Sequence, residues 1–302
     1  MSGLVTLITG GATGLGLACA KHFSRLGARV IICDLPSSKG SDIVKQWSSI
    51  VSSPLNSELD ESDDPLTSLL NERKDDKNNV KIPLSNNLST DQNIQLEPPT
   101  FLSADVTNEE QIQAMFNQIK QQYERLDVLL NCVGIGVAIR TYNINKRSMH
   151  SFDEFKKLLN VNVSGTFNAI RWACHLMADN KPNSQGQRGV IINTASIAAY
   201  EGQIGQVAYA ASKGALVSMT LPLARDLSNM GIRVCAIAPG VFYTPMLAAL
   251  PVRVRLLLGN MVPFPKRLGQ PDDFARLAHM IVENPYLNGE VIRLDGALRM
   301  PP

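Results

Sequence analysis

Two residues in the stretch AYAASKG, Tyr209 and Lys213, have the types and spacing that suit proton transfer. Residues four apart on a helix face each other across one turn. A free tyrosine has a pKa of about 10, which is poorly matched to acid–base work near neutral pH. A positive charge about 4 Å away supplies roughly 4 kcal/mol at an effective dielectric constant of about 20, enough to lower that pKa by about three units. Such pairs are also common on solvated helix faces, so the interpretation depends on the rest of the sequence.

Ser196 lies thirteen residues before Tyr209, at the end of an apolar run that is typical of a buried strand. A serine at the end of a parallel strand can project its hydroxyl into the cleft at the carboxyl edge of the sheet. There it can hydrogen-bond a substrate oxygen and orient it. The alternative is that Ser196 caps a turn or a helix, which is a common role for serine.

A glycine-rich stretch, TGGATGLG at 9–16, follows the first apolar run and opens a helical segment. Glycines let the backbone approach a pyrophosphate, and the start of a helix offers free N–H groups. Asp34 ends the second predicted strand, where a carboxylate can bind the adenosine ribose hydroxyls and repel a 2′-phosphate. We therefore expect a dinucleotide site that prefers NAD to NADP. The alternative is that Asp34 is only a turn residue before Pro36.

The elements that must position these residues alternate along the chain. Short apolar runs indicate strands, and segments with helical periodicity lie between them. This alternation predicts an α/β fold in one domain over 1–302, with a doubly wound parallel sheet covered by helices on both faces. The predicted strands are 4–10, 28–34, 125–134, 188–196, 231–240 and 289–296, and the predicted helices are 14–26, 107–124, 152–178, 206–229 and 271–283.

Residues 48–96 interrupt the alternation. The stretch from 41 to 100 has 11 acidic and five basic residues, and Trp47 is its only aromatic residue. Such a segment cannot bury enough apolar surface to offset the entropy lost on ordering it. We expect 48–96 to be a mobile surface insertion, with a short helix at 65–74 as an option. An inert insertion and a partner-binding loop are both open.

The composition excludes several classes of protein. A net charge of +2 over 302 residues is too balanced for a nucleic-acid or membrane-surface protein, and no apolar run reaches the roughly 18 residues of a membrane-spanning helix. Strand-like residues begin at Leu4, which leaves no room for a cleavable targeting peptide. With no CxxC and no histidine pair at ligand spacing, we expect no metal site. Five cysteines are expected to be buried, reduced thiols of an intracellular protein: Cys19, Cys33, Cys132, Cys174 and Cys235.

Together these segments resemble the short-chain dehydrogenase/reductase family. TGGATGLG has the TGxxxGxG form of that family, and AYAASKG has its YxxxK pair, with Ser196 at the expected distance upstream. The resemblance covers 1–47 and 98–302 and implies a Rossmann-type fold. The C-terminal stretch VPFPKRLGQPDDFARLAHMIVENPYLNGEVIRLDGALRMPP is similar to the 3-hydroxyacyl-CoA dehydrogenase type-2 group, also called 17β-hydroxysteroid dehydrogenase type 10. Other matching segments, in order, are Asp105-Val106, NCVG at 131–134, NVNVSGTFN at 160–168 and PGVFYTP at 239–245.

The resemblance implies a catalytic set of Ser196, Tyr209, Lys213 and Asn162. Tyr209 is then the general base of alcohol oxidation and the general acid of ketone reduction. Ser196 also binds the substrate oxygen, and Lys213 also holds the nicotinamide ribose. Asn162 either holds a water that passes protons from Lys213 to solvent or ties two strands together, and the two roles are compatible.

The resemblance also implies a binding site for NAD. In that site Asp105 and Val106 contact the adenine, and the backbone of Cys132 lies beside the adenosine ribose. Phe242 and Thr244 flank the nicotinamide carboxamide. The full set of implied cofactor-binding residues is Gly10, Thr13, Gly14, Leu15, Gly16, Asp34, Asp105, Val106, Cys132, Tyr209, Lys213, Phe242 and Thr244.

Two segments bear on the substrate. Residues 241–264 are apolar with interspersed arginines, and we expect a mobile lid over a pocket that suits an acyl chain or a steroid. Within them, Tyr243 stands where the group has a glycine, which alters the mouth of the substrate site. The loop 140–150 carries three bases that either attract the phosphates of coenzyme A or form a solvated loop: Arg140, Lys146 and Arg147.

The group implies (S)-3-hydroxyacyl-CoA as the leading substrate of an NAD-dependent alcohol dehydrogenase, assembly as a homotetramer, and a mitochondrial location. A cytoplasmic location stays open. A second function known in the group is that of a structural subunit of a mitochondrial tRNA-processing complex, with a tRNA methyltransferase as partner. The presence of Ser196, Tyr209 and Lys213 argues for an enzyme in either case. Neither direct nucleic-acid binding nor membrane binding is expected.

Overall fold

The computed structural model describes residues 1–47 and 97–302, and its centre is a seven-stranded parallel sheet. The strands are β1 (Val5–Thr9), β2 (Arg29–Asp34), β3 (Thr100–Ser103), β4 (Val128–Asn131), β7 (Gly189–Thr194), β8 (Ile232–Pro239) and β9 (Val291–Leu294). Their order is β3-β2-β1-β4-β7-β8-β9, so the direction of winding reverses between β1 and β4. This is the predicted doubly wound sheet, and such a reversal opens a crevice at the carboxyl ends of the strands.

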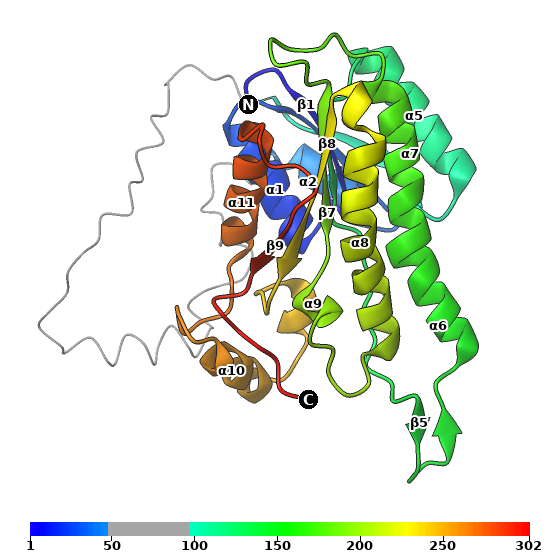
Figure 1. Ribbon diagram of the computed structural model, residues 1–302, viewed down its shortest axis with the longest axis vertical. Coiled ribbons are helices and arrows are strands. Elements are labelled where there is room, and N and C mark those ends of the chain that lie inside the picture. The colour runs from blue at the N-terminus through cyan, green and yellow to red at the C-terminus, as the bar shows by residue number, and fades with distance from the viewer. Residues whose placement is uncertain (48–96) are drawn as a thin grey trace, which may run out of the picture.

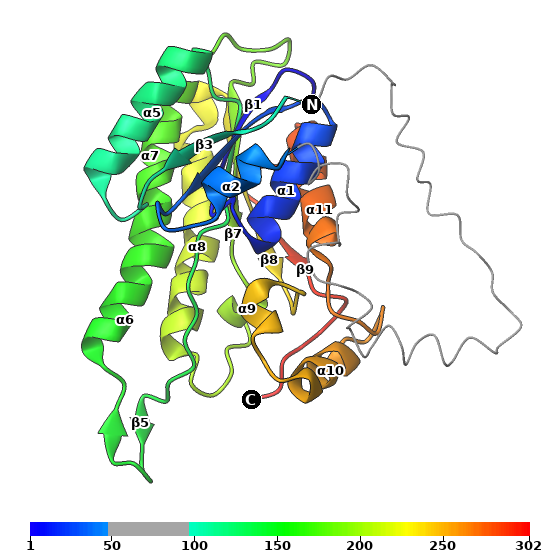
Figure 2. The same cartoon turned by 180° about the vertical axis from the view of Figure 1, so that it is seen from behind.

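Helices cover both faces of the sheet, as predicted (Figures 1 and 2). One face carries α1 (Gly14–Arg25), α2 (Gly40–Lys45) and α11 (Pro271–Glu283), and the other carries α5 (Glu109–Tyr123), α7 (Thr166–Met177) and α8 (Val207–Asp226). Successive residues of a strand point to opposite faces. Ile8 and Ile32 therefore pack on the side of α1, whereas Leu7 and Ile31 pack on the side of α5 and α7. Both faces of the strands are buried, which is why their sequences read as continuous apolar runs.

The predicted helical segment 152–178 is confirmed, and it contains a π-helical stretch that was not predicted. It comprises α6 (Phe152–Leu159), a π-helical segment at Asn160–Gly165 and then α7. π-Helical turns occur mostly as local bulges inside α-helices and often mark functional sites. Here the bulge contains Asn162, whose side chain is fully buried and bonded to neighbouring elements. The helical periodicity of the sequence could not reveal these contacts between Asn162 and neighbouring elements.

Several short elements were not predicted. A hairpin of β5 (Tyr142–Asn143) and β6 (Ser148–Met149) projects from the body of the molecule (Figure 1). The expected lid segment forms two helices, α9 (Pro245–Ala248) and α10 (Val252–Met261), which lie near the C-terminus (Figure 1). The predicted insertion 48–96, with its optional helix at 65–74, lies outside the described residues.

Over 1–47 and 97–302, no helix combines the length and apolarity needed to cross a membrane. In the same ranges no three histidine, cysteine or acidic side chains gather as a metal site. The cysteines are free thiols; Cys19, Cys33 and Cys235 are buried, and Cys132 and Cys174 are partly buried.

A histidine pair joins α1 to α11. The Nε2 atom of His22 lies 3.3 Å from Nδ1 of His279, although the two residues are 257 positions apart. Burial lowers the pKa of His22 to about 4, and the nearby His279, Arg276 and Arg25 act in the same direction, whereas Asp272 opposes them. The folded protein therefore holds His22 in its neutral form.

We expect this pair to make the protein sensitive to acid. The folded state binds a proton at His22 less tightly than the unfolded chain, whose histidine pKa is about 6.5. The full free energy of unfolding is therefore present above pH 6.5. As the pH falls from 6.5 through 4, the folded state loses about 3 kcal/mol of stability because His22 must be protonated. In urea unfolding at pH 7 and pH 4, His22→Gln should lose about that much less stability between the two pH values than the wild type. Identical losses in both proteins would contradict this assignment.

Candidate active site

The glycine turn between β1 and α1 is shaped by close backbone contacts. Gly10 and Gly14 have φ angles of +67° and +53°, a region that L side chains rarely adopt. A Cβ atom on Gly16 would lie 2.2 Å from the carbonyl oxygen of Gly10. Thr13 is the N-cap of α1, but its side chain makes no capping bond, and Leu15 follows in the first turn. The Thr13 side chain thus leaves the first N–H groups of α1 available, which fits a phosphate group.

Asp34 lies beside this turn, at the end of β2. Its Oδ2 atom accepts a hydrogen bond of 3.0 Å from the N–H of Ala12, and Oδ1 accepts one of 2.8 Å from the N–H of Leu35. The carboxylate is thus fixed at the edge of the glycine turn, as a ribose-binding group requires. The alternative interpretation of Asp34 as a turn residue is also consistent with the structure, because both of the N–H groups that it binds belong to the backbone.

The other residues implied in cofactor binding surround the same edge. The Asp105 carboxylate accepts bonds from the N–H and hydroxyl of Thr107, and Val106 is buried against Gly165. Cys132 donates its N–H to the Thr9 carbonyl at 3.0 Å, and its Sγ accepts a bond of 3.6 Å from the Thr194 hydroxyl. These contacts leave the backbone of 131–134 next to the glycine turn, where a Cβ on Gly10 would lie 2.8 Å from the Val133 nitrogen.

The loop after β8 reaches the glycine turn from the other side. A Cβ on Gly14 would lie 3.6 Å from the Thr244 side chain, so Thr244 stands over the turn. The Phe242 ring is buried and meets Phe274 edge-to-face at a centroid distance of 6.5 Å. Its side chain therefore belongs to the core, and only the backbone of Phe242 is available to flank a cofactor.

Ser196 and Tyr209 meet in the structure, as expected. The Ser196 side chain lies close enough to Tyr209 to lower the pKa of the phenol, and the Ser196 hydroxyl accepts a bond of 3.1 Å from the N–H of Ala198. Ser196 is the N-cap of a 3₁₀ turn at Ile197–Ala199, so its capping role and its position beside Tyr209 coexist. The two residues come from the end of β7 and the first turn of α8.

Lys213 lies one turn further along α8 and is buried. Its ammonium group donates a bond of 2.7 Å to the Thr194 carbonyl and lies 5.8 Å from the centroid of the Tyr209 ring. Burial lowers the pKa of Lys213 to about 8. The ammonium group thus bonds to the end of β7 and faces the ring of Tyr209.

We expected Lys213 to lower the pKa of Tyr209, but in this structure that pKa is raised. Burial raises the pKa of Tyr209, and the nearby Ser196 side chain has a smaller, opposing effect. The physical reason is that Tyr209 leaves water on folding, which disfavours the phenolate. At neutral pH the phenol therefore keeps its proton, which is the state that a general acid requires.

Asn162 ties the π-helical segment to two other elements. Its Oδ1 accepts a bond of 2.9 Å from the N–H of Ile135, and its Nδ2 donates to the Ile135 carbonyl at 2.9 Å and to the Ser212 hydroxyl at 3.0 Å. Asn162 thus joins a helix to the loop after β4 and to α8, whereas the expected tie was between two strands. A Cβ on Gly134 would lie 3.4 Å from the Lys213 ammonium and 3.6 Å from Asn162 Oδ1, so both groups border Gly134.

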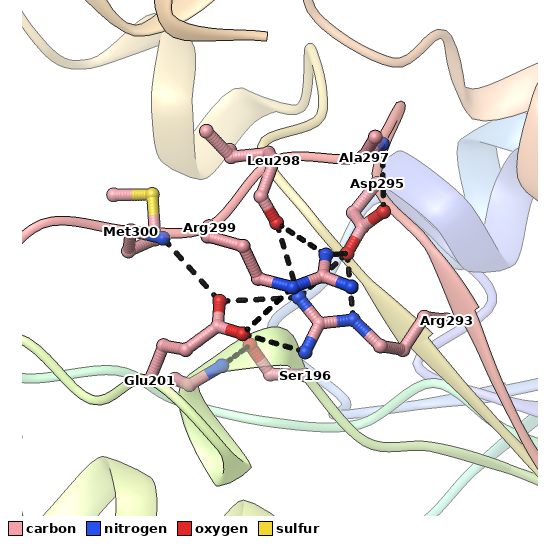
Figure 3. Close-up of polar contacts among 9 residues, drawn as sticks. Ser196, Glu201, Arg293, Asp295, Ala297, Leu298, Arg299 and Met300 are labelled. Carbon is pink, nitrogen blue, oxygen red and sulfur yellow. Dashed lines mark hydrogen bonds and ion pairs between the residues drawn. The ribbon is translucent and has the colours of Figure 1, made fainter. Parts of the chain in front are cut away.

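A network of charged side chains joins the segment that follows Ser196 to the C-terminal residues, and it was not predicted from the sequence (Figure 3). Arg293 of β9 donates two bonds to Glu201, of 2.7 and 3.1 Å, and one of 2.7 Å to Asp295. Arg299 joins both carboxylates, and the N–H of Met300 donates to Glu201 at 3.3 Å. These bonds hold the pKa of Glu201 below its usual range. The C-terminal residues are thereby fixed to the segment that follows Ser196.

The only sequence signal for this network was the cluster of charges near the C-terminus, which has no local periodicity. Thr194 and Ser212 were also missed, although they bond Lys213 and Asn162. Each lies one or two residues from a predicted catalytic residue, so adjacency was the signal that could have found them.

The family model for short chain dehydrogenases matches residues 4–65 and 77–253, which include parts of the segment expected to be an insertion. The chain belongs to the short-chain dehydrogenase family and is an oxidoreductase. Members of this family typically use NAD or NADP.

Among its relatives, the chain is 46% identical over 298 residues to a 3-hydroxyacyl-CoA dehydrogenase type-2 of Drosophila melanogaster, covering 99% of this chain and 98% of the relative. It is 45% identical over 302 residues to the protein of that name from Rattus norvegicus, covering 100% and 97%. The crystal structure of a 3-hydroxyacyl-CoA dehydrogenase type-2 from Mycobacterium avium superposes with a TM-score of 0.77 at 34% identity, covering 99% and 97%. The resemblance to this group is thereby confirmed.

Proposed function

We propose that this chain is an NAD-dependent dehydrogenase that interconverts (S)-3-hydroxyacyl-CoA and 3-oxoacyl-CoA. The observation that carries the proposal is the juxtaposition of Tyr209 with Ser196, which lowers its pKa, and with the Lys213 ammonium, 5.8 Å from the centroid of its ring. The names of the relatives support the substrate class. The test is NADH consumption by the purified protein with acetoacetyl-CoA, and a protein that binds NADH but leaves acetoacetyl-CoA unchanged would contradict the proposed substrate.

The proposed roles follow from the contacts of each side chain. A bound nicotinamide would supply or accept the hydride at the carbon that carries the substrate oxygen. Tyr209 gives its phenolic proton to that oxygen during reduction and takes it back during oxidation. Ser196 hydrogen-bonds the same oxygen in this proposal, because its side chain lies close enough to Tyr209 to lower the pKa of the phenol. Lys213 supplies positive charge beside Tyr209, and the second lone pair of Asn162 Oδ1 can hold a water between Lys213 and solvent.

The proposed preference for NAD over NADP rests on the charge of Asp34. Asp34→Asn keeps an acceptor for only one of the N–H groups of Ala12 and Leu35, and it removes the repulsion of a 2′-phosphate. The ratio of kcat/KM for NADPH to that for NADH should therefore rise about tenfold or more. Asp42→Asn, on the exposed side of α2, is the matched control and should leave the ratio unchanged. A wild type that already prefers NADPH would refute the assignment.

The proposed attraction of coenzyme A phosphates rests on the projecting hairpin. Arg140, Lys146 and Arg147 are exposed, and among the described residues none of them pairs with a carboxylate. Replacing all three by glutamine should raise KM for acetoacetyl-CoA about tenfold at low salt, less at high salt, and leave KM for a steroid ketone unchanged. Steady-state kinetics at two ionic strengths measures this. Equal changes for both substrates would show that the hairpin is only a solvated loop.

The resemblance also supports a homotetramer located in mitochondria. Sedimentation of the purified chain and microscopy of a tagged form in cells would test these two points separately.

A further inference from the structure

The helix α10 carries an arginine that faces the altered position at the mouth of the substrate site. The Arg255 guanidinium lies 5.8 Å from the centroid of the Tyr243 ring, and its Nη1 atom lies 3.4 Å from the Tyr243 hydroxyl. A guanidinium over an aromatic face is attracted by the ring quadrupole. Tyr243 therefore holds Arg255 in place without neutralising its charge.

Arg255 has unused hydrogen-bonding capacity. Its Nε atom is buried and has no hydrogen-bond partner, and within 1–47 and 97–302 no carboxylate lies within ion-pair distance of its guanidinium. By contrast, Arg267 and Arg293 each pair with a carboxylate at 2.7 Å. A guanidinium has five N–H donors, and a buried donor without an acceptor is costly. An anionic ligand with several oxygens would satisfy them.

The position of Arg255 connects it to the candidate active site. Tyr243 stands between Phe242 and Thr244, and Thr244 lies against the glycine turn. At the other end of α10, Val262 packs with Ile197, which directly follows Ser196. The helix that carries Arg255 thus runs between the loop beside the glycine turn and the segment of Ser196, in the region where α9 and α10 lie together (Figures 1 and 2).

We propose that Arg255, held by Tyr243, is a specificity-determining residue that binds a phosphate group of an acyl-coenzyme A substrate. This inference rests on the proposed function. The acyl and thioester parts of that substrate are uncharged, so its phosphates are the anionic groups that a guanidinium can recognise. The planar fork of arginine matches phosphate oxygens with two parallel hydrogen bonds.

The test compares two thioesters in Arg255→Met. Acetoacetyl-CoA carries the phosphates, whereas the acetoacetyl thioester of N-acetylcysteamine lacks them. The kcat/KM for acetoacetyl-CoA should fall about tenfold to 100-fold, since a hydrogen bond to a charged group is lost. The kcat/KM for the truncated thioester should stay within about twofold of the wild type on the same grounds. Arg253→Met, on the same helix but exposed, is the matched control and should change neither value.

Either of two results with Arg255→Met would overturn the assignment. Equal falls for both thioesters would show that Arg255 only positions α10. A weakened affinity for NADH, measured by fluorescence quenching, with an unchanged preference between the thioesters would assign the phosphate to the cofactor. Thermal unfolding of Arg255→Met checks that the fold persists, and Arg255→Lys should recover part of the lost discrimination because it restores the charge.

Calorimetric binding of free coenzyme A to the NADH complex separates this inference from the proposed function. If the wild type binds coenzyme A, Arg255→Met loses that binding, and acetoacetyl-CoA is nevertheless not reduced, then the reaction was misassigned and the role of Arg255 stands. If the wild type does not bind coenzyme A, the inference is wrong.

Discussion

Tyr209→Phe should lower kcat for acetoacetyl-CoA reduction by about 10²- to 10⁴-fold, the range that a positioned acid–base group contributes. Phenylalanine keeps the ring that Lys213 faces and removes the hydroxyl whose pKa Ser196 lowers. Because burial raises the pKa of Tyr209, the wild-type phenol is protonated at neutral pH and ready to donate. Reduction should therefore hold its rate around neutral pH, and oxidation should accelerate as the pH rises and the phenolate forms.

The measurement is the loss of NADH absorbance at saturating substrate, beside the affinity for NADH. Tyr200→Phe is the matched control, because Tyr200 is a nearby tyrosine with an exposed side chain. It should retain wild-type kcat. If Tyr209→Phe keeps more than about a tenth of the wild-type kcat, another group transfers the proton and the proposed role of Tyr209 is wrong.

Lys213→Met should abolish activity to a similar degree without lowering stability at pH 7. The ammonium group is buried and bonded to the Thr194 carbonyl, and burial lowers its pKa to about 8 from 10.5. Keeping this charge inside the folded protein costs about 3 kcal/mol at pH 7 relative to the unfolded chain. Methionine removes that cost and leaves the Thr194 carbonyl without its partner, at about 1–3 kcal/mol. The free energy of unfolding should therefore equal or exceed the wild-type value.

The pH dependence gives the sign of this effect. Below pH 8 Lys213 is protonated in both the folded and the unfolded state, so the cost is complete. As the pH rises from 8 to 10.5, the folded state releases its proton first, and the wild type gains about 3 kcal/mol relative to Lys213→Met. Urea unfolding of both proteins at pH 7, 9 and 10.5 measures this gain. A difference that is constant with pH would contradict a buried, charged Lys213.

Local patterns in the sequence were sufficient for the architecture and for part of the candidate site. Strands that are buried on both faces need continuous apolar runs, so Val5–Thr9 and Ile232–Pro239 were visible in the sequence. The separation of Tyr209 from Lys213 follows from the helical repeat alone. The glycine turn was predictable because Gly10 and Gly16 meet constraints set within a few residues and by the adjoining strand.

Other features depend on contacts between residues far apart in the chain, and only the tertiary structure decided them. His22 meets His279 because α1 packs on α11, and Glu201 meets Arg293 across 92 residues because β9 joins the sheet beside β8. The pKa of Tyr209 rises because the whole fold removes its phenol from water, a burial that no spacing encodes. Sequence alone therefore determined which chemical groups are present and their order along the chain, whereas packing determined their charge states and partners.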